Sequence, residues 1–137
     1  MKRILTATTA AFSSGILLGF LAFAGVSDDD DGAVQNPPPG VIEPMPGSSV
    51  AGCQLTEQKC SNPYTIRTGV GKPVTFSNTD NTAHTITSGT TKTGPDGAFD
   101  SGLVLSGSTY EIVITQRGEY DWFCLVHPWR TGMIIVW

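Results

Sequence analysis

The chain has 137 residues, which is enough for one domain with tails and too few for several domains or a long repeat array. Charged residues make up 15% of it, against about 25% in a typical soluble domain, and its 16 Gly and 9 Pro favour a turn-rich β protein. The net charge is −4. Because phosphate binding needs clustered Lys and Arg, this charge argues against nucleic acid as a partner.

The N-terminus has the pattern of an export signal. Lys2 and Arg3 precede an apolar run, residues 4–26, with an A-x-A cleavage pattern at 22–24. The same run is long enough to cross a bilayer as a helix that the two basic residues hold on the cytoplasmic side. We expect residues 1–26 to be a cleaved signal peptide or a membrane anchor. In both cases the rest of the chain is extracytoplasmic, either in a secreted or periplasm-like space or anchored to the outer face of the cell membrane.

Residues 27–49 contain four consecutive Asp, three consecutive Pro and few apolar side chains. This composition predicts a disordered acidic and Pro-rich linker. The acidic run lacks the alternating ligands and the distal Glu of a calcium loop, so we interpret it as a solvated charge run. The folded domain is expected to span residues 50–137.

Strand periodicity runs through residues 50–137, and no segment there has a sustained helical period. Three groups of side chains recur every second residue and so share a face: Val74 and Phe76; Tyr110, Ile112 and Ile114; Tyr120, Trp122 and Cys124. Further strands are expected at 64–68, 84–87 and 133–137, whereas 88–102 is expected to be irregular. Short strands separated by turn signals predict an all-β sandwich or barrel, most commonly of Greek-key type.

Two of the three cysteines are predicted to form a disulfide. Cys53 and Cys60 lie seven residues apart in a polar segment of an exported chain, where oxidising conditions favour pairing. Cys124 is left without a partner. A free thiol is a liability outside the cytoplasm, which makes Cys124 a candidate metal ligand.

The two histidines of the chain complete a candidate copper site. Cys124 ends a strand, His127 follows three residues later, and His84 begins another strand after a loop. One thiolate and two imidazoles form the trigonal set that suits both Cu(I) and Cu(II). Structural zinc is the alternative, but it needs a fourth ligand, for which Cys53 or Cys60 would have to leave the disulfide.

These residues also carry a resemblance to a known family. Residues 74–78, 80–85 and 118–124, together with the loop from Cys124 through His127, Pro128 and Trp129, resemble the cupredoxins, the blue type 1 copper proteins. The similarity is to the plastocyanin and amicyanin-like members and, in residues 52–60 and 94–102, to small exported archaeal ones. It implies a Greek-key sandwich, one copper ion held equatorially by His84, Cys124 and His127, and one-electron transfer.

The chain departs from the family pattern at the axial position. Relatives carry a weak axial Met shortly after the second ligand His, and here Arg130 occupies that place. Guanidinium stays protonated and cannot ligate a metal. Met133, one residue after Gly132, is the remaining candidate for an axial ligand. Otherwise the axial position is expected to be open, or filled by water or a backbone carbonyl.

Three functions follow from these expectations. The first is an electron carrier, rather than an enzyme, that passes single electrons between redox partner proteins and docks through Pro128 and Trp129; we expect it to be a monomer. The alternative is an open copper site that binds or oxidises a small molecule such as nitric oxide. A lesser alternative is a copper carrier, although such proteins often use Met-rich or exposed Cys motifs.

Overall fold

The computed structural model describes residues 37–55 and 60–137. The predicted signal or anchor segment lies outside these residues. Within them, no helix has the length and apolar character needed to span a bilayer. The elements are the short 3₁₀ helix η1 (Cys53–Leu55) and nine strands: β1 (Val41–Pro44), β2 (Ser61–Asn62), β3 (Thr65–Thr68), β4 (Pro73–Ser77), β5 (Thr87–Thr90), β6 (Gly94–Asp100), β7 (Thr109–Val113), β8 (Gly118–Phe123) and β9 (Thr131–Val136).

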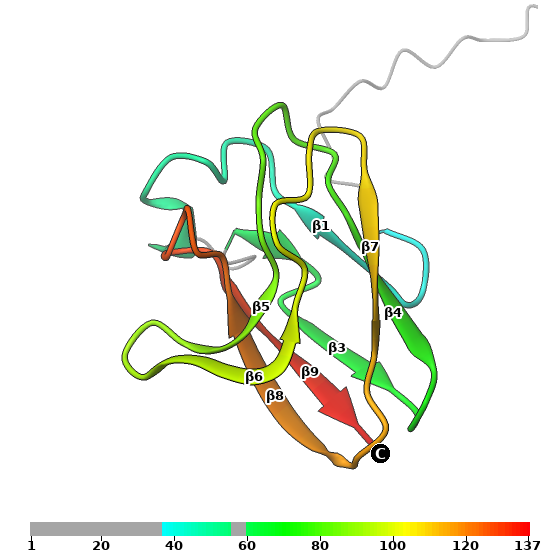
Figure 1. Ribbon diagram of the computed structural model, residues 1–137. Coiled ribbons are helices and arrows are strands. Elements are labelled where there is room, and N and C mark those ends of the chain that lie inside the picture. The colour runs from blue at the N-terminus through cyan, green and yellow to red at the C-terminus, as the bar shows by residue number, and fades with distance from the viewer. Residues whose placement is uncertain (1–36, 56–59) are drawn as a thin grey trace, which may run out of the picture. The chain divides into compact units, whose positions relative to one another are not determined.

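The strands form two sheets, as the sequence predicts for a β-sandwich (Figure 1). One sheet has the strand order β2-β1-β4-β7 and the other β3-β9-β8-β5-β6. Two pairs, β1 with β4 and β3 with β9, are parallel, and the remaining pairs are antiparallel. Strands distant in sequence are therefore neighbours, as Greek-key connections require.

Alternating side chains build the core between the sheets. In β9, Gly132, Ile134 and Val136 are buried and alternate with half-buried residues. In β4, Val74 and Phe76 are buried in the same way. The shared faces predicted from the sequence are thus the faces that fill the core, which also contains Ile42, Ile66, Ile86, Val104, Ile112, Ile114 and Trp122. Gly132 lets the Trp122 ring lie against the β9 backbone, because a Cβ there would fall 2.5 Å from that ring.

The predicted boundary at residue 50 is wrong. Residues 41–44, which the composition places in a linker, form β1, which pairs with β2 and, in parallel, with β4. Ile42 is 0% exposed and belongs to the core. A four-residue strand flanked by Pro and Gly carries too little alternation to be recognised, although Ile42 gains as much from burial as any other core residue. The part of the linker before residue 37 lies outside the described residues.

The segment 88–102 is also more regular than predicted. It contains most of β5 and all of β6, which pair as an antiparallel hairpin with a register shift between Thr87 and Gly89. Side chains replace some ladder bonds, since Ser88 Oγ donates to Phe99 O and accepts from Phe99 N–H. Because Gly and Pro are depleted in strands, the sequence pattern did not indicate this hairpin. Conversely, His84 lies outside any strand and forms one isolated bridge with Val104.

Candidate metal centre

Three side chains from two segments of the chain converge at one end of the sandwich. The Nδ1 atoms of His84 and His127 lie 3.0 Å apart. Cys124 Sγ lies 3.9 Å from His84 Nδ1 and 3.8 Å from His127 Nδ1. His84 and Cys124 are buried, whereas His127 is half-buried. Among the described residues, this is a group of His, Cys, Asp or Glu side chains that could hold a metal ion.

The spacing of these donors fits a trigonal metal site. A metal about 2.0 Å from each nitrogen and about 2.3 Å from sulfur, in one plane, sets roughly 3.5 Å between the nitrogens and roughly 3.7 Å between nitrogen and sulfur. The measured separations of 3.0, 3.8 and 3.9 Å are close to these values. Two imidazoles and one thiolate are the donors that copper prefers.

Structural zinc fits the same residues less well. A structural zinc site is closed by four protein ligands, and this group contains three. Cys53 and Cys60, from which a fourth ligand could come, are bonded to each other in a disulfide with an S–S distance of 2.09 Å. The predicted disulfide is thereby confirmed, and the donor set favours copper over zinc.

A buried asparagine positions His84. Asn78 is 0% exposed, and its Nδ2 donates to Thr82 O and to Val104 O, both at 2.8 Å. These bonds close the loop that ends at His84 and hold it against Val104. His84 in turn exchanges two backbone hydrogen bonds with Val104, of 3.1 and 2.8 Å. Asn78 therefore fixes the loop from which His84 projects.

Asp80 selects the tautomer of His84. Its carboxylate lies 2.9 Å from His84 Nε2, the ring nitrogen remote from Cys124. An acceptor at Nε2 keeps the proton there and leaves the Nδ1 lone pair free for a metal. Partial burial raises the pKa of Asp80, but hydrogen bonds from His84 and the Asn81 N–H outweigh it and hold that pKa below 3.8. Asp80 is therefore ionised at neutral pH.

Cys124 is poised as a thiolate. Burial alone raises its pKa, but polar contacts with His84, the hydrogen bond from the Thr85 N–H and a polar contact with His127 bring it from 9.0 down to about 5. The Thr85 N–H lies 3.2 Å from Sγ. Thr85 also accepts a 2.8 Å hydrogen bond from the Leu125 N–H through its Oγ1, which ties the two ligand-bearing segments together.

The sequence did not reveal the roles of Asn78, Asp80 and Thr85. The available signals were that these residues lie close to His84 in the sequence and belong to the segments 74–78 and 80–85 that resemble the cupredoxins. Polar residues in a loop have many uses, and a hydrogen bond between a loop carboxylate and one particular ring nitrogen depends on how the loop folds.

The segment that carries Cys124 and His127 is braced from the N-terminal side. Within it, the Cys124 N–H donates to Arg130 O at 3.0 Å and the Arg130 N–H donates to His127 O at 2.8 Å. From outside, Ser48 O accepts a 2.8 Å hydrogen bond from Trp129 Nε1, and Cys60 Sγ lies 3.6 Å from Trp129 O. Figure 1 shows this segment in orange beside the cyan chain that precedes the disulfide. The residues before position 50 thus support the metal centre as well as the core.

Arg130 is buried beside the donor group. Its side chain is 0% exposed, and Cζ lies 5.7 Å from the centre of the Phe76 ring. None of its three guanidinium nitrogens has a hydrogen-bond partner among the described residues. Burial lowers the pKa of Arg130, while the charges of Cys124 and Asp80 raise it. Guanidinium remains protonated in proteins, so the site contains a buried cation.

Met133 is poorly placed to be an axial ligand. It pairs with Asp121 on β8 and alternates with the buried Gly132 and Ile134. Successive side chains of a strand point to opposite faces, so Met133 lies on the outer face of its sheet. Asp121 and Glu119, on the same face, are exposed.

Exposed apolar side chains border the metal centre. Leu125 and Val126, between Cys124 and His127, are 45% and 48% exposed. Leu103 and Leu105, on either side of Val104, are both 62% exposed. Pro128 is exposed, whereas Trp129 is half-buried, and its ring meets that of His127 edge-on at 5.4 Å. We call Leu103, Leu105, Leu125, Val126 and Pro128 the apolar rim.

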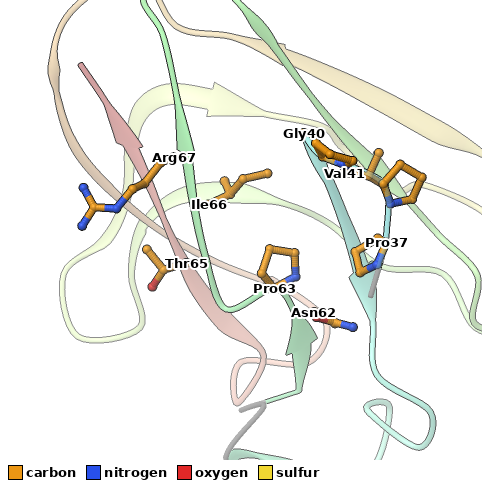
Figure 2. A pocket seen from close by; sticks show the side chains of 10 residues that line it. Pro37, Gly40, Val41, Asn62, Pro63, Thr65, Ile66 and Arg67 are labelled. Atoms are coloured by element: carbon orange, nitrogen blue, oxygen red, sulfur yellow. The ribbon is translucent and has the colours of Figure 1, made fainter. Parts of the chain in front are cut away.

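A separate groove of about 620 Å³ lies between the start of β1 and β3. Figure 2 shows Pro37, Gly40 and Val41 on one side of it and Thr65, Ile66 and Arg67 on the other. None of the residues that line it belongs to the donor group. The metal centre and the groove are therefore distinct features.

Comparison with known proteins agrees with the fold and the donor set. The chain is 27% identical over 122 residues to amicyanin-alpha from Methylorubrum extorquens, covering 88% of this chain and 92% of that protein. A purple cupredoxin from Nitrosopumilus maritimus superposes with a TM-score of 0.62 at 28% identity, covering 71% of this chain and 98% of that one. A Cu(I) form of an amicyanin variant superposes with a TM-score of 0.51 at 21% identity, covering 71% and 80% of the two chains. No protein-family model matches.

The resemblance to the cupredoxins is therefore confirmed. The chain has the cupredoxin fold, and its sequence is similar to that of an amicyanin over nearly its full length. The likeness to the Nitrosopumilus protein agrees with the predicted similarity to archaeal members. The donor group contains the ligands that copper prefers, one thiolate and two imidazoles.

The low pKa of Cys124 predicts how the metal-free protein responds to pH. The ultraviolet absorbance of the thiolate should disappear with a midpoint near pH 5 rather than near 9.0, and Cys124→Ser should lack this transition. Because the pKa is depressed in the folded state, the ionised thiol stabilises the protein fully above pH 9.0, and this contribution is lost as the pH falls to about 5. A midpoint above pH 8 would contradict the hydrogen bonding described above.

Proposed function

We propose that the chain is a mononuclear type 1 copper protein that carries single electrons between redox partner proteins outside the cytoplasm. The observation that carries the proposal is the convergence of His84 Nδ1, Cys124 Sγ and His127 Nδ1 within 4.8 Å of one another. Bound copper supplies one-electron chemistry by alternating between Cu(I) and Cu(II). We assign His84, Cys124 and His127 as its equatorial ligands.

The surrounding residues serve electron transfer by keeping the ligands in one geometry. Asn78 and Asp80 fix the ring of His84, Thr85 donates to the sulfur, and Trp129 anchors the His127 segment to Ser48. Ligands that these contacts hold in one geometry need little rearrangement when the charge of the centre changes. Rigid support of this kind suits a protein whose task is fast electron exchange.

The apolar rim is the proposed docking surface. Half-buried His127 lies among exposed Leu125, Val126 and Pro128, which gives a partner a short path to the metal centre through the imidazole edge. Exposed apolar patches commonly mark interaction sites. Trp129, predicted to dock as well, uses its indole N–H to hold Ser48 O, so we assign it mainly to supporting the segment.

The proposed location outside the cytoplasm has two supports. One is the signal-like run at residues 4–26, and the other is the Cys53–Cys60 disulfide, which persists in oxidising compartments. Whether the apolar run is removed or retained as an anchor would be seen from the mass of the mature protein.

Copper loading tests the proposal directly. The protein loaded with Cu(II) should have an intense visible absorption band from thiolate-to-copper charge transfer, which ascorbate bleaches. Cys124→Ser should lose the band because it removes the thiolate. A colourless protein that instead takes up one equivalent of zinc under the same conditions would exclude the proposed function.

A substitution in the apolar rim tests docking. Val126→Lys places a charge beside His127, so two copies should repel each other, and electron self-exchange should slow by roughly tenfold or more, where tenfold corresponds to about 1.4 kcal/mol. The visible spectrum should not change. Val113→Lys is the matched control, because Val113 is 56% exposed on β7 in the other sheet. Equal effects of the two substitutions would rule out the rim as the docking surface.

A second candidate is a copper site that binds or oxidises a small molecule such as nitric oxide. It is favoured by the axial region, where Arg130 cannot ligate and Met133 lies on the outer face. Azide distinguishes the candidates. An electron carrier should keep its visible spectrum in the presence of azide, because no metal position is exchangeable, whereas rapid formation of a new charge-transfer band would favour the second candidate.

A further inference from the structure

Two side chains of opposite charge flank the donor group without belonging to it. Asp80 accepts from the outer nitrogen of His84 at 2.9 Å and is 12% exposed. Arg130 is 0% exposed, and its cation is coupled to the Cys124 thiolate. Each charge thus acts on a different ligand. We call Asp80 and Arg130 the charge pair.

The stability of the fold does not explain why a guanidinium occupies the position of Arg130. A buried charge is costly unless hydrogen bonds or opposite charges offset the cost. The three nitrogens of Arg130 have no hydrogen-bond partner among the described residues, although Cys124 and Asp80 favour its cation. Any residue except Pro, which lacks an N–H, could make its backbone hydrogen bonds to Cys124 and His127. What a guanidinium adds at this position is a fixed positive charge, held where water screens it poorly.

We propose that Asp80 and Arg130 are opposed positioning residues that set the reduction potential of the metal centre, with Arg130 raising it and Asp80 lowering it. This inference rests on the proposed function. Reduction removes one unit of positive charge from the centre, so a nearby cation favours the reduced form and a nearby anion favours the oxidised form. Asp80 acts through His84, since a carboxylate at the outer nitrogen makes the imidazole a stronger donor.

The charge of Arg130 takes the role that axial coordination has in relatives. In the sequence, Arg130 stands where relatives carry an axial Met, and it brings a positive charge and no donor atom. The potential of this centre is therefore controlled by charge in place of axial coordination. This arrangement predicts that the reduction potential changes strongly when the charge is removed and only weakly when the charge moves by about an ångström.

The substitutions that test the inference separate charge from ligation. Arg130→Leu removes the cation and cannot ligate a metal, unlike Met or Gln, either of which can act as a weak axial ligand. Arg130→Lys keeps the charge but loses the planar fork. Asp80→Asn removes the anion and keeps an acceptor oxygen for His84 Nε2. The double variant Asp80→Asn with Arg130→Leu removes both charges.

The midpoint potential of each copper-loaded variant is the readout, with the visible spectrum as the check on ligation. Arg130→Leu should lower the potential, Asp80→Asn should raise it, Arg130→Lys should stay near the parent value, and the double variant should lie between the single variants. The shifts should persist at high salt, because Arg130 is fully buried. Equal potentials for the Leu, Lys and parent proteins, or shifts of the same sign for Asp80→Asn and Arg130→Leu, would overturn the inference.

Failure of the proposed function is distinguishable from failure of the inference. A parent protein without the charge-transfer band would refute the proposed function. A coloured parent protein whose reduction potential is the same in all the variants would refute the inference alone. The metal-free Arg130→Leu protein should unfold near the parent temperature, because it loses a buried cation without hydrogen-bond partners but also loses the charge that opposes the Cys124 thiolate. A much lower unfolding temperature would make Arg130 a structural residue. In that case Arg130 would have no place in the charge pair.

Discussion

The metal centre depends on keeping one sulfur ionised inside a small protein. Burial alone makes the Cys124 thiolate unfavourable, and the Thr85 N–H, together with polar contacts from the two imidazoles, offsets this cost. Thr85 and His84 belong to one segment, and His127 belongs to the segment of Cys124 itself. The thiolate is stable only when both segments are in place. The sandwich therefore has to hold the two segments together, and the three donor atoms lie within 4.8 Å of one another.

The two sheets hold the segments that carry the ligands in fixed positions. Cys124 follows β8, which pairs along its whole length with β9 and, near its end, with β5. His84 precedes β5 and is held to Val104 by two backbone hydrogen bonds. Short loops between such strands have little freedom to separate the ligands. The additional brace from Ser48 and the Cys53–Cys60 disulfide then restrains Trp129, which follows the exposed part of the His127 segment.

What the sequence could predict depended on how local each signal was. Cys124 and His127 are three residues apart, and His84 was the one other histidine, so the donor group could be inferred from residue types and strand ends. The core faces of β4, β7 and β8 followed from alternation. β1 and the β5–β6 hairpin could not be inferred, because their strands contain Pro, Gly and Asp and are held by long-range pairing with β4 and β8. The role of Asp80 was hidden for the same reason, since it depends on the fold of the loop that Asn78 closes.

The charges of the site explain why this arrangement suits an electron carrier. Cys124 and Asp80 are anions, Arg130 is a cation, and the imidazoles are neutral when they ligate, so the metal-free site has one net negative charge. With Cu(I) the whole site is neutral, and with Cu(II) it carries one positive charge. Without Arg130 the reduced site would be a buried anion, which a low-dielectric interior disfavours. Without Asp80 the oxidised site would carry two positive charges. Because the two residues balance each other, neither oxidation state has a large uncompensated charge, and the protein can exchange an electron while its surroundings change little.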